Sequence, residues 1–191
     1  AKEVAHHELG LFNAQNLANT VWAFATAGVR ADELYAAVAK EVARRGLGDF
    51  NAQELANTVW AFAKADVTAD ELYAAVAKEV ASRGLGRFNA QDLANTVWAF
   101  AKADVRADAL FAQVAHALPN MSLNQLDLVQ VAHSFRTMTE ASTALPVLAR
   151  VAGAAAALNW QEFERSLANL TFTLAKAGLA QLNLGVYKLS L

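Results

Sequence analysis

Side chains that could bind a nucleic acid recur along this sequence at nearly regular intervals. Each set combines an amide residue, a small residue, and a hydroxyl or lysine residue, spaced four and then three positions apart. Such spacing places each set on one face of a helix, and these groups can hydrogen-bond to base edges or phosphates. The five sets are Asn19, Ala23 and Thr26; Asn57, Ala61 and Lys64; Asn95, Ala99 and Lys102; Gln130, Ser134 and Thr137; and Asn169, Thr173 and Lys176.

These sets allow two interpretations. Stacked repeats would bring them into parallel rows along a concave face, where single-stranded RNA could bind. The recurring asparagines could instead bond the backbone of a neighbouring helix and lock the stack. Positions that vary between repeats are the better candidates for base reading, although helix capping also explains the variable positions near each helix start. The variable positions are Thr26, Lys64 and Lys102, together with Asn16, Glu54 and Asp92.

Three tryptophans form a further recurring feature. Trp22, Trp60 and Trp98 each follow a valine of an apolar helical stripe by one residue. If exposed, they would form a stacking ladder for bases. We expect them instead to pack between helices, because an exposed row of tryptophans would promote aggregation.

Catalytic and metal-binding chemistry has little support. His6, His7, His116 and His133 include no pair at the i, i+4 spacing of a helical metal site, and the chain has no cysteine. No glycine-rich phosphate loop follows a strand. The net charge is −2, and no apolar run approaches the roughly 18 residues of a membrane span. We therefore expect no enzyme activity, no cofactor, no metal and no membrane span.

A duplicated segment organises the whole chain. Leu17–Phe24 returns unchanged at Leu55–Phe62 and at Leu93–Phe100, and the interval is 38 residues each time (55 − 17 and 93 − 55). An unchanged return at a fixed interval identifies a repeat protein. With only two prolines and many good helix formers, the chain is predicted to be a single all-α domain over residues 1–191, a right-handed α-solenoid of about five antiparallel helix-turn-helix repeats. The predicted repeats are 12–49, 50–87, 88–121, 122–158 and 159–191, with 1–11 as the end of a preceding repeat.

The first helix of each repeat has a clear start signal. Asn13, Asn51 and Asn89 are good N-cap residues, and Asn51 with Glu54 approximates a capping box. Apolar residues then follow at i, i+4 and i+7, which predicts a helix covered on two sides. The predicted structural core of these helices is Leu17, Val21, Trp22, Phe24, Leu55, Val59, Trp60, Phe62, Leu93, Val97, Trp98 and Phe100.

The second helix of each repeat is predicted over Asp32–Arg45, Asp70–Arg83 and Asp108–Leu118. Gly-Leu-Gly segments after the first two should supply left-handed residues that end the helix. Basic residues on these helices, including Arg45 and Arg83, are offset by acidic residues. This pattern predicts a solvated face of mixed charge and gives no phosphate track.

The segment Phe88–Ala103, with the sequence FNAQDLANTVWAFAKA, resembles the core of the octotricopeptide repeat. This family of organellar helical-repeat proteins has a 38-residue period, and similar repeats occur in proteins with a RAP domain. The resemblance is strong over residues 12–121 and weak beyond them. It implies a solenoid that binds organellar RNA, about one nucleotide per repeat, with base-reading positions near those occupied by Asn16 and Thr26 and their equivalents.

Two functional hypotheses follow. The first is a non-catalytic protein of a chloroplast or mitochondrion, with the chloroplast favoured by the resemblance alone, that binds single-stranded RNA and affects the stability, processing or translation of a transcript. The second is a structural scaffold that binds protein subunits of an organellar assembly such as a ribosome, photosystem or respiratory complex. A positively charged concave face would favour RNA, whereas a neutral face with exposed Leu or Phe would favour a protein partner.

Overall fold

The computed structural model describes residues 9–159 and 164–178. Within these ranges every regular element is a helix, as the sequence predicts. The helices over Asp32–Arg45 and Asp70–Arg83 begin and end at the predicted residues. In chain order the elements are η1 (Leu9–Leu11), α2 (Ala14–Ala27), α3 (Asp32–Arg45), α4 (Ala52–Lys64), α5 (Asp70–Arg83), α6 (Ala90–Lys102), α7 (Asp108–Ala117), η2 (Leu118–Asn120), α8 (Gln125–Met138), α9 (Ala141–Ala156) and α10 (Glu164–Lys176).

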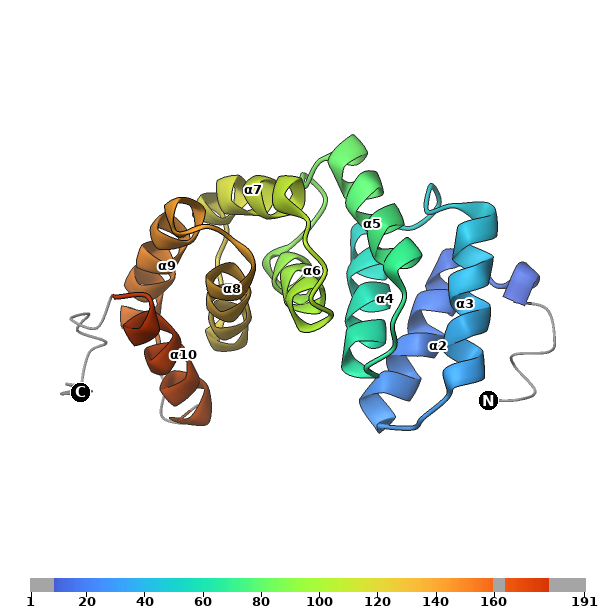
Figure 1. The fold of residues 1–191 in the computed structure, drawn as a ribbon, viewed down its shortest axis with the longest axis horizontal. Coiled ribbons are helices and arrows are strands. Elements are labelled where there is room, and N and C mark those ends of the chain that lie inside the picture. The colour runs from blue at the N-terminus through green and yellow to red at the C-terminus, as the bar shows by residue number, and fades with distance from the viewer. Residues whose placement is uncertain (1–8, 160–163, 179–191) are drawn as a thin grey trace.

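The helices form two layers that curve together into an arc (Figure 1). The inner helices α2, α4, α6, α8 and α10 pack side by side, and the outer helices α3, α5, α7 and α9 lie against them. This arrangement confirms the predicted all-α solenoid. The repeat boundaries and the right-handed superhelix stay predictions. The expected contribution of residues 1–8 and the segment after residue 178 lie outside the described residues.

Asparagine caps define the start of the inner helices. The backbone N–H of Glu54 donates to Asn51 Oδ1 (2.9 Å), and the N–H of Asn51 donates to Glu54 Oε2 (2.8 Å), which completes the predicted capping box. The same reciprocal pair joins Asn89 and Asp92. It also occurs before α8, between Asn124 and Asp127, where the repeat has diverged in sequence.

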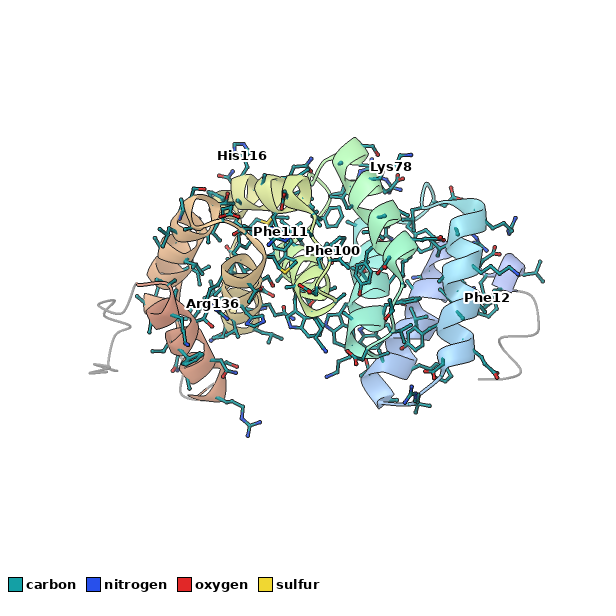
Figure 2. All side chains as sticks on the ribbon, viewed as in Figure 1. Phe12, Lys78, Phe100, Phe111, His116 and Arg136 are labelled. Carbon is teal, nitrogen blue, oxygen red and sulfur yellow. The ribbon has the colours of Figure 1, made fainter. Side chains whose placement is uncertain are left out.

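Tyrosines join the outer helices α3 and α5 to the inner helices on either side. Tyr35 Oη on α3 donates to Val21 O on α2 (3.1 Å), and the Tyr35 ring meets the Phe62 ring of α4 edge-on at 5.0 Å and 85°. Phe111 meets Phe135 in the same way without a hydroxyl bond. Figure 2 shows Phe111 between the layers, while Lys78 and His116 point outward from the outer layer. In the second repeat, Tyr73 makes the equivalent contacts with Val59 O (3.3 Å) and with the Phe100 ring (5.1 Å, 82°).

Arginines of the outer helices bind the loops that precede the inner helices. Arg45 Nη1 donates to Phe12 O (2.6 Å) and Arg45 Nη2 donates to Leu9 O (3.0 Å), while Glu41 pairs with the same guanidinium (2.6 Å). Arg83 makes the equivalent bonds one repeat later. The predicted solvated face is therefore wrong for Arg45, which is half-buried, whereas Arg83 is exposed as predicted. Each guanidinium also donates to loop carbonyls 33 and 36 residues earlier in the chain, which the charge pattern did not predict.

The Gly-Leu-Gly segments end the outer helices through their first glycine. Gly46 has φ +76° and ψ −175°, and Gly84 has φ +71° and ψ 178°. This region of backbone conformation is open almost only to glycine. The second glycines, Gly48 and Gly86, are not among the positive-φ residues, so the prediction holds for only one glycine of each pair.

Candidate functional site

The inner helices expose one continuous stripe of side chains. On α4, apart from the capping residue Glu54 and the small residues near the helix ends, the side chains that solvent reaches are Gln53, Asn57, Trp60 and Lys64. Their spacing of i, i+4, i+7 and i+11 places them on one helical face. We call these positions the inner-face stripe. Its other members, all exposed or half-buried, are Gln15, Asn19, Trp22 and Thr26 on α2; Gln91, Asn95, Trp98 and Lys102 on α6; Leu126, Gln130, His133 and Thr137 on α8; and Arg165, Asn169, Phe172 and Lys176 on α10.

The stripe corrects the predicted middle position in four of the five polar sets; the exception is Ala23, which is exposed on α2. Ala61, Ala99 and Ser134 are fully buried, and Thr173 is nearly so. The physical reason is that the inner helices pack directly on one another, and only small side chains fit along that line of contact. The amide and the Thr or Lys of each set do lie on the exposed face, but the residue between them is the aromatic one, a single position earlier.

The tryptophans are accordingly more exposed than the sequence suggests. Trp22 is 43% exposed, so its expected burial between helices is wrong. Trp60 and Trp98 are half-buried against the core, and their ring centroids lie 6.2 Å apart with 36° between the ring planes. His133 and Phe172, the latter 61% exposed, occupy the same position on α8 and α10. We call these five residues the aromatic ladder.

The amide residues of the stripe are mostly available to a ligand. Within the described residues the side chains of Asn19 and Asn57 make no hydrogen bond, so the predicted alternative of an asparagine lock does not hold there. Gln130 Nε2 donates to Asn95 Oδ1 across α8 and α6 (3.3 Å). This hydrogen bond links the side chains of the stripe on α6 and α8.

Two of the three variable residues near the helix starts, Glu54 and Asp92, serve as caps through their side chains. The carboxylates of Glu54 and Asp92 accept hydrogen bonds from the N–H groups of Asn51 and Asn89, and Asp92 is buried. Burial raises the pKa of Asp92, and the bond from Asn89 opposes that effect. Asn16 takes part through its N–H, which donates to Asn13 Oδ1 (2.8 Å). The capping interpretation therefore accounts for the carboxylates of Glu54 and Asp92.

The charged residues of the stripe are all cations. Lys64, Lys102, Arg165 and Lys176 belong to it, and none of its twenty positions holds Asp or Glu. Lys102 Nζ pairs with Asp66 of the preceding repeat at 2.9 Å, beside the stripe. Lys176 Nζ lies 5.3 Å from the centre of the Phe172 ring, and Lys64 forms no ion pair within the described chain.

The imidazole of His133 adds a neutral member to the ladder. Partial burial of the ring lowers the pKa of His133, and the positive charge of Arg136 lowers it further. Figure 2 places Arg136 on α8, beside α10. At neutral pH the imidazole is therefore mainly uncharged, which suits stacking better than ion pairing.

Other kinds of site find no support in the part of the chain that the structure describes. Among these residues no three His, Cys, Asp or Glu side chains are grouped so that they could hold a metal ion. No helix there has the length and apolar composition needed to cross a membrane. Sequence reasoning missed Gln15, Gln53 and Gln91, although the i, i+4, i+7 relation to the asparagine and tryptophan of each repeat was a signal for them.

The fold and its inner-face stripe define the class: a helical-repeat protein with a continuous polar and aromatic inner face. The sequence model of the RNA-editing substrate-binding complex 6 protein family matches residues 3–176, and the chain belongs to this family. It is thus a helical repeat protein of an RNA-associated family. A comparison with curated proteins found no match.

Proposed function

We propose that this chain is a non-catalytic protein that binds single-stranded RNA along the inner-face stripe. The observation that carries the proposal is the aromatic ladder, with amides beside it and cations at its edge. Each aromatic face can stack one base, at about 1–3 kcal/mol per base, whatever the base is. The amides can then bond to base edges, and the lysines can neutralise phosphates.

Charge segregation supports this proposal despite the net charge of −2. Acidic side chains are used elsewhere: Glu41 and Glu79 pair with arginines on outer helices, and Glu54 and Asp92 cap inner helices. The stripe itself carries four cations and no acid. Because Lys102 is paired with Asp66, Lys64, Arg165 and Lys176 are the stripe cations that we expect an approaching polyanion to meet.

The family match supports an RNA-related role, because its description names a complex that binds the substrate of RNA editing. Action on an organellar transcript, the chloroplast as location and membership of the octotricopeptide repeat family are parts of the proposal that rest on the sequence resemblance. A role as protein scaffold is the second candidate. It is favoured at the C-terminal end of the stripe, where Leu126 (53%) and Phe172 are exposed.

Fluorescence anisotropy with labelled single-stranded RNA at two salt concentrations tests the proposal. We expect binding that weakens as salt rises, because phosphate contacts release counterions. Trp22→Ala should lower the affinity by about fivefold or more, the loss of one stacked base. Lys64→Ala should reduce the salt dependence by roughly one phosphate contact.

Lys78→Ala is the matched control, since Lys78 is exposed on outer helix α5, away from the stripe (Figure 2). It should leave RNA binding unchanged. Absence of salt-dependent RNA binding would refute the proposal, and binding of a purified protein partner that is lost in Phe172→Ala would support the scaffold function instead.

A further inference from the structure

The first three inner helices present the same residues at the same stripe positions. Each offers Gln, Asn and Trp in that order, at residues 15, 19 and 22, then 53, 57 and 60, then 91, 95 and 98. The fourth position is Thr26, Lys64 or Lys102. The backbone repeats as well, because each of these helices follows an asparagine cap with φ between −72° and −85° and ψ between 173° and 176°.

One spacing in the aromatic ladder, that between Trp60 and Trp98, is close to the spacing for one inserted base. The Trp60 and Trp98 ring centroids are 6.2 Å apart. A base stacked between two rings requires about 6.8 Å, twice the rise of about 3.4 Å between stacked bases. The two rings would have to move apart by about 0.6 Å (6.8 − 6.2) to admit a base. It would lie beside Asn57 or Asn95, three positions before the tryptophan and on the same helical face.

We infer that helices α2, α4 and α6 select a run of one nucleotide type. This inference rests on the proposed RNA binding and names the ligand more closely. Gln, Asn and Trp recur in the same order on helices with the same capped backbone, so we expect successive repeats to favour the same base. The surroundings differ in that Trp22 is more exposed than Trp60 and Trp98. Of the three asparagines, Asn95 alone is bonded within the described chain, to Gln130. If one amide contact discriminates by about fivefold, the low end for a specific base contact, three independent contacts together give about 100-fold.

The preference should not extend past the third repeat. On α8 the stripe holds Leu126, Gln130 and His133, and on α10 it holds Arg165, Asn169 and Phe172. These side chains differ in size, charge and hydrogen-bonding groups from the first three sets. The chain is thus divided into three equivalent positions followed by two distinct ones.

Twelve-nucleotide RNAs of fixed mixed sequence, each with one central triplet AAA, CCC, GGG or UUU, test this inference. Each has a control of the same composition in which the three nucleotides are separated. We expect one triplet to bind at least tenfold more tightly than its dispersed control and than the other triplets. A fourth identical nucleotide should add less than twofold.

Two results would overturn the inference. One is that every triplet binds within twofold of its dispersed control. The other is that Asn57→Ala, with unchanged helicity and melting, leaves the preferred triplet's advantage intact; we expect that advantage to fall about fivefold. The side chain of Asn57 makes no hydrogen bond in the described chain, so its removal breaks no hydrogen bond of the fold; Lys78→Ala is the control. Loss of all RNA binding by the unaltered protein would instead refute the proposed function.

Discussion

The tyrosine contacts between the layers can be tested by removing two hydroxyl groups. In the double variant Tyr35→Phe/Tyr73→Phe the rings remain edge-on to Phe62 and Phe100. Only the bonds from Tyr35 Oη to Val21 O (3.1 Å) and from Tyr73 Oη to Val59 O (3.3 Å) are lost. The third repeat already contains this arrangement, since Phe111 packs on Phe135 without a hydroxyl.

The loss of unfolding free energy at neutral pH depends on whether the two carbonyls keep a hydrogen-bond partner. Val21 O and Val59 O lie within α2 and α4, where each also accepts a helical N–H, so neither is left without a partner. Each lost bond should then cost about 1 kcal/mol, and the double variant about 2 kcal/mol of unfolding free energy. Tyr73→Ala, which also removes the buried ring, should cost about 3–5 kcal/mol.

The difference in unfolding free energy between the unaltered protein and the double variant should disappear at alkaline pH. Burial raises the pKa of Tyr35 and of Tyr73 above the ordinary value of 10.0. Above pH 10 the unfolded chain loses these protons while the folded chain keeps them, so the stability of the unaltered protein falls as pH rises. The fall approaches about 1.4 kcal/mol per tyrosine for each pH unit. Near pH 11 the two proteins should therefore be about equally stable.

Urea unfolding followed by circular dichroism at pH 7, 10 and 11 measures both effects. All other titrating groups are shared, so the difference between the two proteins isolates the two hydroxyls. A stability difference that stays constant from pH 7 to pH 11 would show that the hydroxyls are not buried in the folded state. Equal stability at pH 7 would show that their hydrogen bonds contribute nothing.

Three other features of the outer helices lead to predictions about stability, two of them with a neighbouring residue as the control. Arg83→Ala should lower the unfolding free energy by about 2 kcal/mol in urea titrations, since it removes charged bonds to loop carbonyls, whereas Arg87→Ala, exposed and without such bonds, should change it little. Gly84→Ala should cost about 1–3 kcal/mol because φ is +71°, while Gly86→Ala, with no positive φ and open space around it, should be nearly neutral; equal effects would contradict the backbone argument. Hydrogen bonds from two arginines lower the pKa of Glu41 to about 2 from 4.5, so its stabilisation is present above pH 4.5 and is lost as pH falls toward 2. The melting temperature of Glu41→Gln should accordingly vary less over that range than that of the unaltered protein.

Much of the fold could be predicted from the sequence because an unchanged octapeptide returns every 38 residues and so gives the length of the repeat. Three copies of one octapeptide fix the register, the asparagine caps mark helix starts, and glycines mark helix ends at Gly46 and Gly84. The arginine contacts could not be predicted, because Arg45 and Phe12 are far apart in sequence and charge patterning describes only neighbours on the same helix.

The candidate site could be predicted in part. The amides and the Thr or Lys positions of each set do lie on the exposed face. The tryptophan was predicted to be buried and the alanine next to it to be exposed, whereas on α4 and α6 the alanine is the buried one of the two. Each lies about 100° around the helix from the other, so periodicity alone does not decide which one meets the neighbouring helix. The larger residue was expected inside. In the structure the close approach of inner helices requires the alanine there, as Ala61 and Ala99 show.

This packing constraint bears on function. Once alanine occupies the contact between inner helices, the residue one position earlier lies at the edge of that contact, where Trp60 and Trp98 are half-buried. A single exposed ring such as Trp22 would need no explanation. The same position, however, holds Trp, Trp, Trp, His and Phe on five successive inner helices, and the charged residues in line with it are all cations. Packing accounts for these rings only in part, because Trp60 and Trp98 are half-buried whereas Trp22 and Phe172 are exposed. The recurrence of rings at one position beside cations therefore favours a stacking ligand that carries negative charge.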